Sequence, residues 1–210
     1  MNIKHITKQW PFRPMPVGWR KKEWDSVREA KTIADLVPIS HRVMDHFSPN
    51  PVFLVSGPIS TGGILKPGTE DADIKANLQC FNQAVETLFK GGLLLFNQIP
   101  FEDLFVPVNK AWKIEHPDTY CMPILEDFYR GLFDHKHLQG IVLIPGWESS
   151  FGANWEVKTI TSLRKNVLDL PVDWHKKKPE EVAVHIASLD IVKRYKRKRP
   201  VSRIASYAMQ

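Results

Sequence analysis

Short apolar runs alternate with longer amphipathic stretches from residue 51 to residue 195. Runs of four apolar residues, typical of buried strands, lie at 52–55, 93–96 and 141–144, and a fourth predicted strand at 167–170 contains one Asp. Apolar residues spaced three to four positions apart, which predict helices, lie at 74–88, 122–133, 151–164 and 179–195. Because strands that alternate with helices form parallel sheets, we expect a three-layer α/β domain of the Rossmann or flavodoxin-like type.

The first fifty residues have a different pattern. Their apolar spacing predicts an amphipathic helix over residues 21–36 and a second short helix over residues 40–47, after a proline-containing loop. We therefore divide the chain into an N-terminal helical arm (1–50), an α/β domain (51–190) and a basic C-terminal tail (191–210). The arm is expected to pack on the domain or on a second subunit.

Residues 98–117 predict a long connection rather than a helix or strand. It contains three prolines, and its aromatic residues Phe101, Phe105 and Trp112 look exposed. Long connections of this kind beside a site often act as lids. We therefore expect this segment to cover part of a binding site.

The basic character of the chain is concentrated at its C-terminus. Residues 191–210 contain seven Lys or Arg residues and no acid, so with a net charge of +6 for the chain the remainder carries −1. A duplex-binding domain would carry its basic residues on the domain surface. We favour a solvent-exposed tail over one that contacts nucleic acid or an acidic partner.

Hydropathy and cysteine usage predict a cytoplasmic protein without membrane contact. The sequence has no run of eighteen apolar residues and no signal peptide. Cys80 and Cys121 lie in or beside apolar helical patterns without CxxC spacing, which predicts reduced core thiols. The sequence contains no zinc-protease, P-loop or α/β-hydrolase motif. The spacing of His135 and His137 does not match that of zinc ligands, so we expect neither a metal nor a cofactor.

The stretch from Ile141 to Glu156 carries the clearest candidate chemistry. A predicted strand leads through a Pro-Gly turn to Ser149 and Ser150, and a helix is expected to begin at Phe151. Ser150 would then cap a helix end, where unpaired N–H groups and the helix dipole favour an anion. Because helical side chains lean toward the N-terminus, Glu156 would point back to the same place. A phosphate and a carboxylate are thus predicted side by side.

A second glycine-rich turn, SGPISTGG at residues 56–63, follows the first predicted strand. Ligands of open α/β sheets bind beyond the carboxyl ends of the strands. Both turns are therefore expected at the same edge of the sheet, where they would form one site.

These two segments, together with Asn77 at the start of the following helix, resemble the nucleoside 2-deoxyribosyltransferase-like superfamily. The second segment, LIPGWESSFGANWE at residues 143–156, is similar to the PGWxxSxGAxxE signature of a group common in phages. The superfamily includes deoxyribosyltransferases and nucleoside 5′-monophosphate N-glycosidases, which act on the bond between base and sugar. The resemblance covers roughly residues 51–170.

The resemblance implies roles for particular residues. It identifies Glu156 with the catalytic carboxylate, which attacks the anomeric carbon or stabilises its positive charge. Residues implied to bind sugar and phosphate are Gly57, Ile59, Ser60, Thr61, Gly62, Ser149, Ser150 and Gly152. Residues implied to contact the base are Trp147, Gln139 and Asn77. It further implies a small-molecule nucleotide as ligand and a homo-oligomer in which a neighbouring subunit completes the site.

Two positions depart from the family pattern. Gln139 stands where related sequences usually carry an Asp before the third strand, and Leu54 stands where many carry a Tyr. Because Gln cannot act as a general acid, the alternative is a nucleotide-binding or sensing protein that has lost base protonation. Asp134, His135 or His137 would restore an acid only if the loop brought one into the site. A glycohydrolase of ADP-ribose or NAD type remains a third interpretation.

Overall fold

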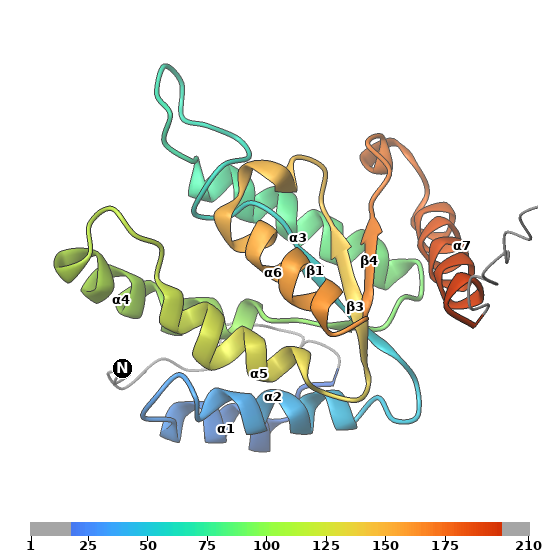
Figure 1. The fold of residues 1–210 in the computed structure, drawn as a ribbon, viewed down its shortest axis with the longest axis horizontal. Coiled ribbons are helices and arrows are strands. Elements are labelled where there is room, and N and C mark those ends of the chain that lie inside the picture. Colours follow the sequence, from blue (N-terminus) through green and yellow to red (C-terminus); the bar gives the residue numbers. More distant parts are fainter. Residues whose placement is uncertain (1–17, 199–210) are drawn as a thin grey trace, which may run out of the picture.

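The computed structural model describes the backbone of residues 18–198 and, within this range, the side chains other than those of residues 102, 103 and 190–198. Four parallel strands form one sheet in the order β2-β1-β3-β4 (Figure 1). The strands are β1 (Val52–Ser56), β2 (Leu95–Phe96), β3 (Leu138–Leu143) and β4 (Asn166–Asp169). Their carboxyl ends meet at one edge, which is the edge predicted to carry the site.

Helices cover both faces of this sheet, so the predicted three-layer α/β fold is confirmed. Alternate strand residues enter two separate cores: Phe53 and Val55 pack with α3 (Ile74–Lys90) and α7 (Pro179–Lys198). Leu54 packs on the other face with α6 (Phe151–Ser162) and the remaining helices. The remaining helical elements are α1 (Lys21–Glu29), α2 (Leu36–Asp45), α4 (Ile99–Glu115), the π-helix η1 (Ile124–Tyr129), α5 (Arg130–Phe133), η2 (Trp147–Ser149) and η3 (Trp174–Lys176).

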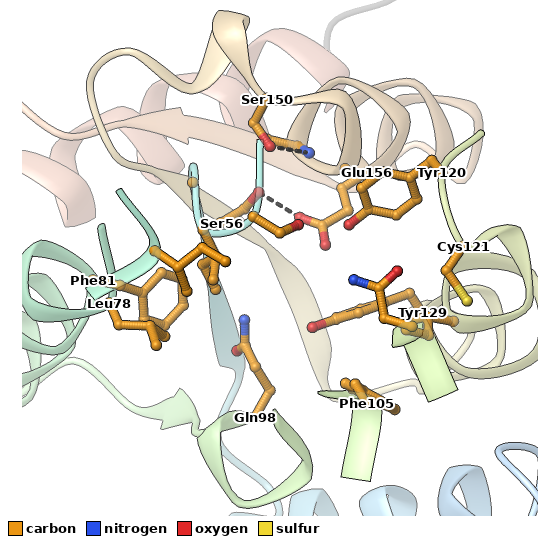
Figure 2. Close-up of a pocket in the computed structure, with 18 of the residues that line it drawn as sticks. Ser56, Leu78, Phe81, Gln98, Phe105, Tyr120, Cys121, Tyr129, Ser150 and Glu156 are labelled. Carbon is orange, nitrogen blue, oxygen red and sulfur yellow. Dashed lines mark hydrogen bonds between the residues drawn. The ribbon is translucent and has the colours of Figure 1, made fainter. Parts of the chain in front are cut away.

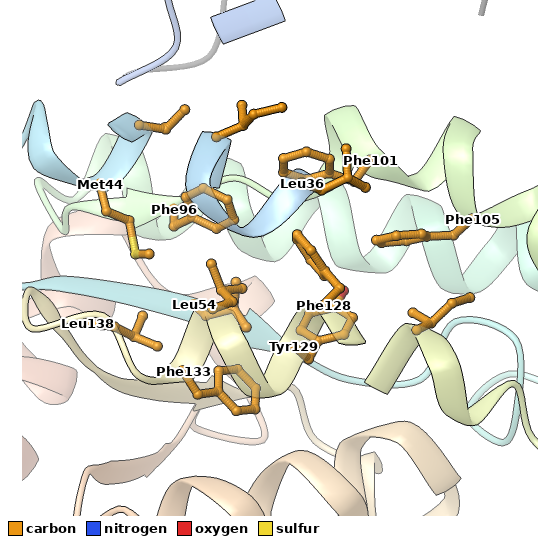
Figure 3. Close-up of a cluster of buried hydrophobic side chains, with 14 of the residues drawn as sticks. Leu36, Met44, Leu54, Phe96, Phe101, Phe105, Phe128, Tyr129, Phe133 and Leu138 are labelled. Carbon is orange, nitrogen blue, oxygen red and sulfur yellow. The ribbon is translucent and has the colours of Figure 1, made fainter. Parts of the chain in front are cut away.

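The N-terminal arm packs on the domain and shares its larger core. Leu36 and Met44 of α2 lie in one cluster with Leu54 of β1 and Phe128 of η1 (Figure 3). Figure 1 shows α1 and α2 in blue, with α2 beside α5 and α1 packed on α2. The arm is thus continuous with the core of the α/β domain over its described residues.

The prediction of a single helix over residues 21–36 is wrong, because the chain turns after α1. The Asp35 carboxylate accepts hydrogen bonds from the N–H groups of Lys31 (2.9 Å) and Thr32 (2.8 Å), which closes a turn. These backbone hydrogen bonds also lower the pKa of Asp35. The next helix consequently begins at Leu36 rather than at Ser40.

The prediction of an irregular connection at residues 98–117 is also wrong, since most of this segment is the helix α4. Pro100 lies in the first turn, where its missing N–H costs nothing. The apolar residues Phe101, Leu104, Phe105 and Val108 are spaced along one helical face and are buried. Their burial outweighs the cost of the internal proline, and Phe101 and Phe105 are core residues rather than exposed ones.

The C-terminal helix extends into the basic tail. Residues 191–198 continue α7, while residues 199–210 lie outside the described residues. The expectation of a solvent-exposed tail falls on side chains that are not described. No helix within residues 18–198 is long and apolar enough to cross a membrane.

Candidate functional site

A cavity of about 350 Å³ opens at the carboxyl edge of the sheet (Figure 2). Its walls come from the loop after β1, from α3 and α4, from the segment between α4 and η1, and from the first turns of α6. This volume lies within the range of small-molecule sites in proteins. The two segments singled out by sequence therefore line one cavity.

Glu156 is the acidic side chain of the cavity wall among the described residues. It lies in the second turn of α6 and is only 7% exposed. The hydroxyl of Ser56, at the end of β1, donates a hydrogen bond to Glu156 Oε2 (Figure 2). Because Ser56 is itself buried on a strand, it holds the carboxylate in a fixed position relative to the sheet.

The helix begins where the sequence predicted. Ser150 is the N-cap of α6, and its hydroxyl accepts a hydrogen bond from the N–H of Ala153 (3.3 Å). Thr61 Oγ1 accepts from the N–H of Phe151 (3.1 Å) and lies 3.4 Å from Ser150 Oγ. Two hydroxyls and the Gly152 backbone thus meet at the helix end. Hydroxyl and N–H groups at a helix end are the kind of group that can hold a phosphate without a lysine.

Asn77 holds the loop after β1 in place rather than lining the cavity. This residue is 3% exposed, and its Nδ2 donates to the carbonyls of Ile59 (3.2 Å) and Gly62 (3.0 Å). Its Oδ1 accepts from the N–H of Ile64 (2.8 Å). A side chain with both amide groups engaged fixes the loop in one conformation. The implied base contact of Asn77 therefore becomes a structural role.

Ser149 fastens the same loop to the turn before α6. Its hydroxyl accepts from the N–H of Gly63 (2.8 Å) and donates to the carbonyl of Gly146 (2.7 Å). Gly62 lies so close to Ser149 that a Cβ at residue 62 would be 2.3 Å from the Ser149 carbonyl oxygen. Neither Ser149 nor Gly62 lines the cavity, but together they join its two walls.

We expect Asn77→Ala to destabilise the protein by about 2 kcal/mol, because two carbonyls and one N–H group of the loop lose the partners that a buried side chain provides. Urea unfolding measures this difference in free energy. Asn82→Ala is the matched control, since Asn82 lies exposed on the same helix, and should change stability by less than about 0.5 kcal/mol. Equal effects of the two substitutions would contradict the loop-holding role of Asn77.

The remaining predicted residues divide into two groups. Gly57, Ile59, Ser60 and Gly152 line the cavity with Ser150 and Glu156, whereas Thr61 lies behind its wall at the start of α6. Trp147 does not, since it lies half-buried in η2 against the larger core.

Gln139 does not line the cavity either, because it lies at the amino end of β3. The four residues from there to Leu143 span about 13 Å along the strand. Asp134, His135 and His137 precede β3 and share this opposite edge, where His135 Nε2 lies 3.2 Å from Asp45 Oδ1. None of them supplies the acid that Gln139 lacks.

Sequence reasoning missed several residues that line the cavity. Gln98, before α4, is 3% exposed, and its Nε2 donates to the Val55 carbonyl (3.1 Å). Tyr120, Cys121 and Tyr129 come from the segment after α4 and from η1. Reading the apolar spacing of residues 101–108 as a helical face would have placed α4 against the site. No spacing pattern pointed to Tyr120.

The charged and sulfur groups of the wall complete the site. Lys110 of α4 is the basic residue among the described lining residues. Burial raises the pKa of the Cys121 thiol, which keeps it protonated, and both Cys121 and Cys80 are free thiols as predicted. Within the described part of the chain, no cluster of three or more His, Cys, Asp or Glu residues is arranged to hold a metal ion.

Comparisons with protein-family models, with curated proteins and with solved structures gave no match. The function is therefore inferred from the geometry of the cavity and from the sequence signature that lines it.

Proposed function

We propose that this protein cleaves the bond between base and sugar in a (deoxy)nucleoside 5′-monophosphate, by hydrolysis or by transfer to another base, with Glu156 as the nucleophile. One observation carries the proposal. A buried carboxylate, held by the Ser56 hydroxyl, faces a cavity whose wall also contains a hydroxyl-lined helix end. The resemblance of residues 143–156 to the superfamily signature supports the same chemistry.

The spacing of these groups suits a sugar phosphate. Glu156 lies six positions after Ser150, which is about 9 Å along the helix axis, and the glutamate side chain leans back toward the helix start. A phosphate held by Thr61, Ser150 and the Gly152 backbone would place the sugar over the carboxylate. Glu156 would then attack the anomeric carbon and form a glycosyl ester.

The opposite wall suits a nucleobase. Leu78 and Phe81 of α3 face Phe105 of α4 across the cavity and present apolar surface (Figure 2). Flat aromatic ligands bury well between such side chains. Exposed apolar residues at the rim, among them Ile74, Val106 and Phe151, are consistent with a homo-oligomer in which a second copy covers this edge.

Incubation with a panel of nucleoside and deoxynucleoside monophosphates tests the proposal, with free base measured by chromatography. We expect base release from at least one monophosphate and none from the matching nucleoside without phosphate. Ser150→Ala should weaken binding about tenfold, since one hydroxyl contact is worth about 1.4 kcal/mol when fully lost. No release from any nucleotide would refute the enzymatic function.

A nucleotide sensor is the second candidate. It is favoured by the position of Gln139 at the wrong edge of the sheet, which leaves the cavity without the expected Asp. Binding of a monophosphate without release of base, measured by calorimetry alongside chromatography, would identify the sensor. Adding NAD and ADP-ribose to the panel distinguishes the NAD-type glycohydrolase.

A further inference from the structure

Cleavage of a base–sugar bond usually requires a proton for the departing base, and Gln139 cannot supply it. The described side chains of the cavity wall that carry a transferable proton include Tyr120, Tyr129, Cys121 and Lys110. These side chains differ in their distance from α6, and we compare them on that basis as proton donors.

Tyr120 lies directly against the helix that carries Glu156. Its ring stacks on Phe151, with ring centroids 4.9 Å apart and an angle of 22° between the planes. A methyl group added at Gly152 would lie 2.8 Å from the Tyr120 hydroxyl oxygen and 3.4 Å from its Cζ. Because residues four apart share a helical face, the hydroxyl lies on the same side of α6 as Glu156 (Figure 2).

The other donors are less suitably placed. The Tyr129 ring belongs to the aromatic core, with its centroid 5.0 Å from that of Phe128 and 5.9 Å from that of Phe133. Cys121 is 1% exposed and packs in the same core. Lys110 is exposed on α4 and has no described contact with α6.

We propose that Tyr120 is a catalytic residue of the site and the proton donor to the leaving base. This assignment rests on the proposed function. As a Glu156 oxygen bonds to C1′, the C1′–N bond breaks and its electron pair moves to the base nitrogen, which takes the Tyr120 proton. Water then attacks C1′ of the glycosyl ester, returns a proton to the Tyr120 phenolate and regenerates the Glu156 carboxylate.

The same geometry gives Gly152 a second role. Glycine at this position leaves room for the Tyr120 hydroxyl against the helix backbone, because any larger residue would meet that oxygen at 2.8 Å. The resemblance alone implied only that Gly152 binds phosphate. The two roles predict different results when Tyr120 and Gly152 are changed together.

Replacement of the hydroxyl alone tests the proton transfer. Tyr120→Phe should lower kcat about 100-fold or more on an ordinary nucleotide, in line with the usual contribution of general acids. It should have little effect on kcat for an N7-methylguanine nucleotide, because that base leaves without a proton. If the enzyme accepts only pyrimidines, the substitution should lower kcat less for a 5-fluorouracil nucleotide than for the uracil nucleotide. Loss of structure alone would slow both substrates equally.

Substitution of both residues tests the contact. Gly152→Ala should lower kcat strongly in the wild-type background, because the methyl group displaces the hydroxyl. In the Tyr120→Phe background it should cause little further loss, since the ring carbon at 3.4 Å tolerates a methyl group. A pure phosphate-binding role for Gly152 predicts equal losses in both backgrounds and a change mainly in KM.

The outcomes separate the two proposals. If the wild-type protein releases base and Tyr120→Phe releases it at the same rate, Tyr120 is not the acid and the proposed function still holds. If Tyr129→Phe, and not Tyr120→Phe, lowers kcat more for ordinary nucleotides than for those whose base leaves without a proton, the assignment to Tyr120 is overturned. If the wild-type protein releases no base from any nucleotide, the proposed function fails and the assignment fails with it.

Discussion

Glu156→Gln is expected to abolish base release, with a loss in rate of about 10³-fold or more, because an amide cannot act as the nucleophile. The fold should persist, since the Gln carbonyl can still accept the hydrogen bond that Ser56 donates. Initial rates of base release, together with urea unfolding of both proteins, measure the two effects separately.

Glu148→Gln is the matched control for this substitution. Glu148 lies in the same segment, at a position that the signature leaves open, and it is exposed in η2 and does not line the cavity with Glu156. It should release base at nearly the wild-type rate. Full activity of Glu156→Gln, or equal losses in both variants, would show that Glu156 is not the nucleophile.

His46→Ala is expected to destabilise the protein by about 3 kcal/mol. Glu23 of α1 is 1% exposed, and His46 lies 3.6 Å from its Oε1 while its Nδ1 lies 2.6 Å from the Gly18 carbonyl oxygen. Among the described residues, Glu23 Oε2 has no hydrogen-bond partner, so His46 is the main polar contact of this carboxylate. Removing one partner of a buried pair leaves the other group desolvated and uncompensated. Urea unfolding measures the loss.

The exposed pair between Lys21 and Asp25 provides the control on the same helix. Its side chains are 82% and 40% exposed, so Asp25→Ala should cost less than about 1 kcal/mol. The double variant Glu23→Gln/His46→Ala should recover part of the lost stability, because a buried amide costs less to leave unpaired than a buried carboxylate. A loss below about 1 kcal/mol for His46→Ala would mean that the arm does not depend on this pair.

The strands β1 and β3 were predictable because they are buried on both faces. Such strands are continuous apolar runs, and in β3 the run could be identified although its amino end, Leu138, lies three residues before the predicted start. Ser150 was predictable as a cap because capping depends on local sequence. The position of Glu156 near that cap followed from helical spacing, whereas its catalytic role was implied by the resemblance.

Contacts between distant segments were not predictable from spacing. Ser56 and Glu156 are one hundred residues apart, and their hydrogen bond depends on the register of β1 against α6. The helix α4 was missed because Pro100 and Pro107 suggested a loop, whereas tertiary burial of Phe101 and Phe105 decided the outcome. Gln139 was implied at the site by analogy, but its place at the amino end of β3 keeps it away.

Mass spectrometry of the protein quenched in acid during turnover tests the nucleophilic role of Glu156 most directly. A 2-fluoro-substituted nucleotide, which slows hydrolysis of the ester, serves as substrate. We predict a mass increase equal to one sugar phosphate, located on the peptide that contains Glu156 and lost in Glu156→Gln. Base release with the sugar phosphate attached to a different residue would contradict the role of Glu156 as the nucleophile.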